Sequence, residues 1–143
     1  MKAKAIQLLR QVDLFSCLSE KEIKELEPFI YERTYKKGQY LFFEGDPRLR
    51  IYILLDGFVM LEKSNQQGSL LYTSYVKKNT VFPYMGLFKN GDYNHSAVAE
   101  TDIRVFYMVA DAFESIVSKN SALLKKVILQ VNELLAVQEN RIK

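Results

Sequence analysis

Side chains that could perform metal or nucleophilic chemistry are few in this sequence. His95 is the only histidine and Cys17 the only cysteine among the 143 residues. Metal enzymes need several histidine, cysteine or carboxylate ligands close together, and a disulfide or an iron–sulfur cluster needs more than one thiol. The sequence therefore predicts no catalytic residue, no metal and no cofactor, and we expect the chain not to be an enzyme. We expect Cys17 to be a packing residue, with a redox-sensing thiol as the alternative.

The composition is that of one ordered domain. Hydrophobic residues make up 48% and charged residues 26%, with 9 Phe and 9 Tyr, whereas disordered chains are poor in aromatic residues. The net charge of +3 rests partly on separated lysine pairs, which form no basic stripe and favour a solvated surface over a DNA-binding one. Apolar runs are too short to span a bilayer and no signal-peptide pattern is present. These features predict a cytoplasmic protein with no membrane contact.

Eight short runs between Phe29 and Val109 have the β-branched and aromatic content of strands. They cover residues 30–35, 39–42, 50–55, 58–63, 70–76, 80–82, 94–99 and 103–109. Turn residues separate them, and Asp56-Gly57 is predicted to form a hairpin turn. Because no helical pattern lies between the runs, the sequence predicts a mainly β protein with flanking helices, a jelly roll of about eight strands.

The ordered spacing of six residues carries a resemblance to a known family. These residues are Gly38, Leu41, Gly45, Asp46, Tyr52 and Gly57. Their pattern resembles the double-stranded β-helix (jelly roll) of the cyclic-nucleotide-binding sensor domain in the Crp/Fnr family of bacterial transcription regulators, and the likeness extends from about Leu14 to the C-terminus. The resemblance implies a helical lead-in over residues 1–28, a cyclic-nucleotide-binding-like barrel over 29–110, and a short helix with a long C-terminal dimerisation helix over 111–143.

In family members that bind cyclic nucleotides, a Gly-Glu-Leu sequence and a later arginine hold the ribose and the cyclic phosphate. On the register set by Gly86-Leu87-Phe88, Pro83 replaces the glycine, Tyr84 the glutamate, Met85 the leucine and Tyr93 the arginine. Proline has no N–H to donate, and a neutral phenol neither acts as a carboxylate nor neutralises a phosphate. We therefore expect the chain not to respond to cyclic AMP.

The replacement residues predict an apolar and phenolic pocket. The candidate pocket residues are Tyr84, Met85, Gly86, Leu87, Tyr93, His95, Ser96 and Gln138. Such a lining suits an uncharged or aromatic effector, and the alternative is that these side chains fill the pocket and leave the dimer in one fixed state. A haem sensor of this family would use His95 as an axial ligand, but a lone histidine without a second ligand favours a hydrogen-bonding role.

Helical patterns flank the predicted strands. Residues 3–10 form a short helix, Ser19 to Glu22 and Asp111 to Glu114 are predicted capping boxes, and Asn120 is predicted to cap the long helix. One apolar line of that helix contains Leu124, Ile128, Val131, Leu135 and Ile142. A second line contains Leu123, Val127, Leu134 and Val137. One line can cover the barrel while the other pairs with a second copy, which predicts a homodimer; a helix lying flat on its own barrel is the alternative.

Together these patterns predict the sensor and dimerisation domain of a Crp/Fnr-type transcription regulator. The resemblance implies that DNA is contacted only through a C-terminal helix-turn-helix domain, which this chain does not contain. Because the sequence ends inside a helical pattern, we expect a fragment of a longer regulator. A stand-alone small-molecule-binding or dimeric adaptor module without DNA binding is the alternative.

Overall fold

The computed structural model describes residues 2–65, 67–84 and 91–142. The chain begins with α1 (Lys2–Arg10), η1 (Asp13–Cys17), α2 (Glu20–Leu26) and η2 (Glu27–Phe29). The strands are β1 (Tyr31–Tyr35), β2 (Tyr40–Phe42), β3 (Arg50–Asp56), β4 (Val59–Ser64), β5 (Leu70–Val76), β6 (Val81–Phe82), β7 (Ser96–Ala99) and β8 (Ile103–Val109). Two helices follow them, α3 (Ala110–Ser118) and α4 (Ser121–Ile142).

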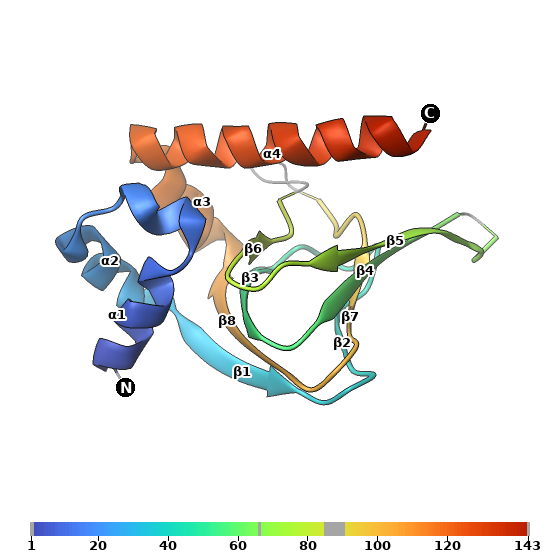
Figure 1. The fold of residues 1–143 in the computed structure, drawn as a ribbon, viewed down its shortest axis with the longest axis horizontal. Helices are drawn as coiled ribbons and strands as arrows, with labels where there is room; N and C mark the ends of the chain where they lie inside the picture. The colour runs from blue at the N-terminus through green and yellow to red at the C-terminus, as the bar shows by residue number, and fades with distance from the viewer. Residues whose placement is uncertain (1, 66, 85–90, 143) are drawn as a thin grey trace.

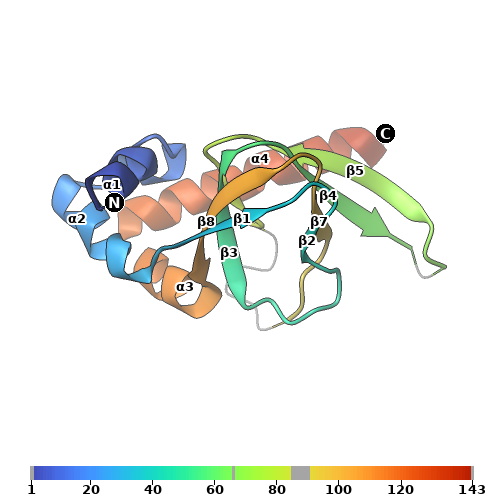
Figure 2. The same ribbon diagram turned by 90° about the horizontal axis from the view of Figure 1, so that it is seen from below.

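The strands form two antiparallel sheets, which fold over one another as a jelly roll (Figure 1). The order is β1-β8-β3-β6 in the first sheet and β2-β7-β4-β5 in the second. Seen from below, α1, α2 and α3 lie at one end of the barrel and the β4–β5 hairpin lies at the other (Figure 2). The predicted mainly β fold with flanking helices and a long C-terminal helix is confirmed, and the predicted strand ends agree with the structure within two residues.

Strand β3 separates two hydrophobic cores. Ile51, Ile53 and Leu55 face the helices, where they pack with residues of α1, η1, α3 and α4. Tyr52 and Leu54 point to the opposite side, into the barrel. This alternation is the period-two geometry of a strand, and all five residues are buried because both faces are covered.

Asp56-Gly57 does not form the predicted hairpin. β3 pairs with β6 and β8, whereas β4 pairs with β5 and β7, so the turn carries the chain from one sheet to the other. Gly57 has φ of +87° and lies against the backbone carbonyl of Asp102. The dipeptide therefore makes a corner of the barrel, and the hairpin interpretation was wrong because local turn chemistry does not decide which strands pair.

Two of the three predicted helix caps are present. The Glu22 N–H donates to Ser19 Oγ at 3.2 Å and the Ser19 N–H donates to the Glu22 carboxylate at 2.9 Å, which completes the first capping box. Asn120 caps α4, since its Oδ1 accepts from the Leu123 N–H at 3.0 Å. The predicted box from Asp111 to Glu114 is wrong, because α3 already begins at Ala110 and has no side-chain cap.

Over the part of the chain that the structure describes, no helix combines the length and the apolar character that crossing a bilayer requires.

Replacement of Gly57 by alanine tests the barrel corner. An added Cβ would lie 2.4 Å from the Asp102 carbonyl oxygen and 2.8 Å from Ile103 Cγ2, in a backbone conformation that alanine disfavours. We expect Gly57→Ala to lower the free energy of unfolding by about 2–5 kcal/mol, measured by urea denaturation. Gly68→Ala is the matched control, because Gly68 has φ of +83° but no atom within 4 Å of the added Cβ. That variant should lose only about 1–2 kcal/mol, and equal losses in both would contradict the close-contact argument.

Candidate effector site

Tyr93, a predicted pocket residue, is built into the barrel interior. Its hydroxyl donates to the Arg50 carbonyl at 2.8 Å and accepts from the Arg50 N–H at 3.0 Å. Its ring stacks on Phe42, with ring centroids 3.8 Å apart. Burial raises the pKa of the Tyr93 phenol, partly offset by its hydrogen bond with Arg50 and by the nearby arginine charges. The side chain is therefore a neutral, fully engaged phenol that joins the start of β3 to the segment before β7.

The Tyr93 ring belongs to a continuous group of aromatic side chains. Phe42 lies 5.8 Å from Tyr52, and Tyr52 lies 5.6 Å from Phe82, measured between ring centroids. Tyr107 continues the group at 6.2 Å from Tyr52. Rings at these separations are in the range of favourable aromatic contacts, so the side of the barrel where Tyr93 lies is packed as a core.

Tyr84 lies in the other core. It packs with the helical residues of α1, η1, α3 and α4, while Tyr93 packs with the barrel residues. Burial raises the pKa of the Tyr84 phenol, and the negative charges of Asp13 and Glu133 raise it further. The structure thus does not bring Tyr84 and Tyr93 together, although they lie nine positions apart in the predicted cassette.

His95 and Ser96 belong to a polar cluster at the end of the second sheet. Ser96 Oγ accepts from the Glu44 N–H at 2.8 Å, and the Glu44 carboxylate accepts from Lys63 Nζ at 2.7 Å and from the Ser64 N–H at 3.1 Å. His95 is 5% exposed. Burial, followed by the positive charge of Lys63, lowers the pKa of the His95 imidazole, and Glu44 opposes this shift. His95 is therefore mainly neutral at pH 7, and no group of three or more potential metal ligands occurs within the described residues.

Four predicted pocket residues cannot be placed as side chains. Met85, Gly86 and Leu87 lie outside the described residues, and Gln138 is described only as part of the α4 backbone.

Two surface grooves lie outside the barrel. The first, with a volume of about 790 Å³, runs between α1 and the strands β1 and β8, and its lining includes Leu8, Glu32 and Arg104. The second, of about 620 Å³, lies at the Gly57 corner. Neither groove is lined by any of the candidate pocket residues.

The first half of α4 shows both predicted apolar lines. Leu123 and Val127 are buried in the helical core, whereas Leu124 and Val131 are partly buried at its margin. Ile128 is 52% exposed. The side chains of the remaining positions, Leu134, Leu135, Val137 and Ile142, lie outside the described residues.

The part of the chain that contains the jelly roll and α3 matches a known family model. A model of the cyclic nucleotide-binding domain aligns with residues 32–120. The chain belongs to the cyclic nucleotide-binding domain family. Its predicted resemblance to the sensor domain of Crp/Fnr-type regulators is thereby confirmed.

Relatives of this cyclic nucleotide-binding domain are named transcriptional regulators. The chain is 28% identical over 106 residues to the HTH-type transcriptional regulator ArcR of Staphylococcus haemolyticus, a match that covers 74% of this chain and 46% of ArcR. The chain thus spans about half the length of the curated relatives it matches.

Among solved structures, the sensor domain of the regulator DNR from Pseudomonas aeruginosa has the same fold. Its TM-score is 0.82 at 21% identity, with 97% of this chain and 93% of that chain covered. The catabolite activator protein of Thermus thermophilus has a TM-score of 0.77 at 20% identity, with 90% and 61% covered.

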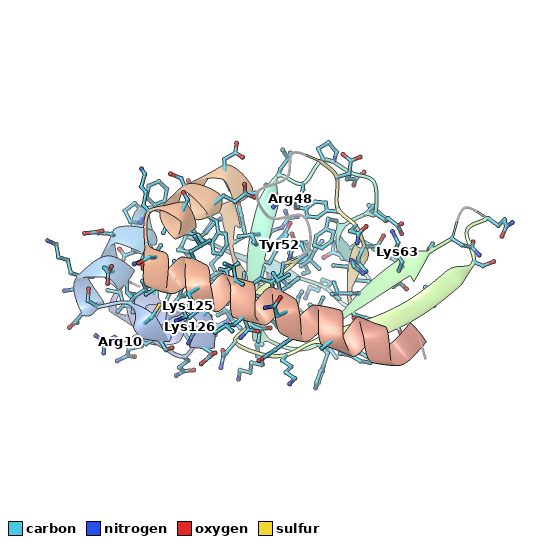
Figure 3. All side chains as sticks on the ribbon, turned by 90° about the horizontal axis from the view of Figure 1, so that it is seen from above. Arg10, Arg48, Tyr52, Lys63, Lys125 and Lys126 are labelled. Atoms are coloured by element: carbon cyan, nitrogen blue, oxygen red, sulfur yellow. The ribbon has the colours of Figure 1, made fainter. Side chains whose placement is uncertain are left out.

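The sequence analysis missed one buried ion pair in this cyclic nucleotide-binding domain. Arg48 Nη2 donates to Glu114 Oε2, and only 5% and 17% of the two side chains are exposed. Figure 3 shows Arg48 beside α3, with Tyr52 further into the barrel. The available signal was an arginine three residues before the apolar run of residues 51–55, where a buried charged side chain would need a partner. Its partner is 66 positions away, so local pattern could not identify it.

Removal of the Tyr93 hydroxyl tests its role in the domain. Tyr93→Phe keeps the stacked ring but removes the hydroxyl that the Arg50 N–H and carbonyl bind. We expect a loss of about 1–3 kcal/mol in the free energy of unfolding, measured by urea denaturation. Tyr31→Phe is the control, because Tyr31 is 52% exposed and also stacks on a neighbouring ring. The control should change stability by no more than about 0.5 kcal/mol, and a comparable loss would show that the Tyr93 hydrogen bonds are not the cause.

The single histidine allows a direct pH test. In the folded protein the pKa of the His95 imidazole should lie below its usual value of 6.5. Proton NMR of the imidazole signals measures this midpoint. Because the folded state binds this proton more weakly than the unfolded chain, the contribution of His95 to stability is complete above pH 6.5 and falls as the pH drops through the folded pKa. Lys63→Met should raise the pKa, since it removes a nearby positive charge and the partner of Glu44. A folded-state midpoint at or above 6.5 would contradict this environment.

Proposed function

We propose that this chain is the sensor and dimerisation half of a Crp/Fnr-type DNA-binding transcription regulator. Support comes from the family match and from the named regulators that are about twice as long as the matched region. In this proposal DNA is contacted only by the other half of the protein. A change in the pairing of two α4 helices then alters the spacing of the attached DNA-binding domains, which requires an effector to bind the two pairings with different affinity.

The exposed apolar side chain of Ile128 is the observation that carries the dimer proposal. Leu123 and Val127 are buried within their own chain, so one side of α4 already has its partner. Ile128 lies on an adjacent side of the helix and is 52% exposed. Burial of an isoleucine side chain lowers the free energy, so a partner that covers Ile128 would be favoured. Pairing of two α4 helices through the line that contains Leu124, Ile128 and Val131 would cover it.

We further propose that cyclic AMP is not the effector. On the family register Tyr84 and Tyr93 occupy the glutamate and arginine positions, and both are neutral phenols. The Tyr93 hydroxyl is already engaged by the Arg50 backbone, and Tyr84 packs among the helices. A buried cyclic phosphate would lack its cation at these positions, at a cost of several kcal/mol by the usual penalty for unpaired buried charge, about 3–5 kcal/mol. An uncharged or aromatic effector suits the barrel better; the stacked rings equally support an interior that its own side chains fill.

A charge placed at Ile128 tests the dimer. Ile128→Glu should weaken self-association at least about 100-fold, because a carboxylate would be buried in the seam, and analytical ultracentrifugation measures the constant. Leu129→Glu is the matched control: it introduces the same charge at a residue of similar exposure, 54%, about 100° around the helix. Its association should stay within about threefold of the parent. A parent chain that is monomeric at micromolar concentration would refute the proposed pairing.

Titration with cyclic AMP tests the effector proposal separately. We expect no saturable heat of binding by calorimetry up to the millimolar range, because neither phenol supplies a charge that favours the phosphate. Saturable micromolar binding would show that another residue holds the phosphate and that the register across Tyr84 and Tyr93 is incorrect.

A further inference from the structure

Arg48 is buried with most of its hydrogen-bonding capacity unused. Its side chain is 5% exposed, and among the described residues only Glu114 accepts from it, through Nη2. Nε and Nη1 are both buried and find no acceptor in the described part of the chain. Buried donors without acceptors are rare in folded proteins, and each such group calls for a bound water or ion.

The backbone of Arg48 is anchored by hydrogen bonds that do not involve its ion pair. The Arg48 N–H donates to the Gly91 carbonyl at 3.1 Å. Two further hydrogen bonds join the same two segments, from the Gly45 N–H to the Tyr93 carbonyl at 3.0 Å and from the Tyr93 N–H to the Asp46 carbonyl at 2.8 Å. The main chain of Arg48 is therefore anchored at this point of the barrel, whether or not Glu114 remains the partner of its side chain.

The buried guanidinium of Arg48 belongs to a segment whose neighbouring residues are exposed. Pro47, Leu49, Gly91 and Asp92, which surround Arg48 in the chain or pair with its segment, are all exposed. A buried arginine needs one neutralising negative charge, and Glu114 supplies it from α3, a separate element. A second anion can take over that function only if Glu114 leaves, because two carboxylates at one guanidinium repel each other.

We propose that Arg48 is an anion site at which the carboxylate or phosphate of a small molecule replaces Glu114. The incoming anion accepts hydrogen bonds from the guanidinium, including donors that are now unused, while Glu114 moves into solvent. The exchange keeps the charge at Arg48 balanced and breaks the side-chain contact between Arg48 and α3. Anion binding could alter the pairing of α4, because α3 leads into α4. Only this consequence rests on the proposed function. The binding site itself is independent of what the barrel interior holds.

Anion titrations of the parent chain and of two variants test the site. The probes are inorganic phosphate and sodium acetate, each at constant ionic strength with chloride as the balancing ion, so that a phosphate ligand and a carboxylate ligand are distinguished. Binding is followed by the NMR signals of the arginine Nε–H groups and by the thermal midpoint. We expect a saturable shift of one arginine signal in the parent chain. Arg48→Met should abolish the shift. Glu114→Gln should lower the dissociation constant of the anion at least about tenfold, because the competing carboxylate is gone.

Arg10→Met is the matched control, because Arg10 also pairs with a glutamate but is 50% exposed. It should leave the titration unchanged. If Arg48→Met does not fold, Glu114→Gln still decides the matter, since a purely structural ion pair predicts lower stability in that variant without tighter anion binding. Equal anion effects in the parent chain and in Glu114→Gln, or a shift that persists in Arg48→Met, would overturn the site. Self-association measured in the same samples separates this outcome from a failure of the dimer proposal.

Discussion

The structure depends on one strand that is buried on both faces. β3 sends Ile51, Ile53 and Leu55 into the helical core and Tyr52 and Leu54 into the barrel. A strand in this position has no solvent-facing side, so both cores must form for either to be complete. The helices at one end of the molecule are therefore needed to bury one face of the first sheet, which makes them structural partners of the barrel rather than a separate attachment.

The segment that includes β6 and Tyr93 contributes to both cores. Val81 and Tyr84 pack with the helices, while Phe82 and Tyr93 pack inside the barrel. Alternation accounts for Val81 and Phe82, because neighbouring strand residues point to opposite faces. A ligand that displaces Tyr84 would thus act directly on the core of α1, η1, α3 and α4. One that displaces Tyr93 would act first on the Arg50 end of β3.

The sequence predicted the elements well and their long-range partners poorly. Strands follow from alternation and β-branched content, and the caps at Ser19 and Asn120 follow from residues three positions apart, so local pattern suffices for both. Asp56-Gly57 has the local signature of a hairpin, but pairing of β3 with β8 is decided about 50 residues away. Glu114 completes a capping-box pattern, but its side chain contacts Arg48. The cassette register likewise gives the order of Tyr84 and Tyr93 but not the faces to which their side chains point.

Side-chain contacts of Lys126, Asn120 and Glu114 show how the C-terminal helices are attached to the rest of the domain. Lys126 Nζ donates to the Asp13 carbonyl at 2.8 Å and to Ser16 Oγ at 2.6 Å, which ties the first half of α4 to η1. Asn120 Nδ2 donates to the Glu22 carboxylate at 2.9 Å and so ties the α3–α4 junction to α2. The Arg48–Glu114 pair instead ties α3 to the barrel loop. Because the Lys126 and Asn120 contacts stay within the helical group, the start of α4 should move together with α2 and η1, and a movement of α3 away from the loop before β3 would break the Arg48–Glu114 pair.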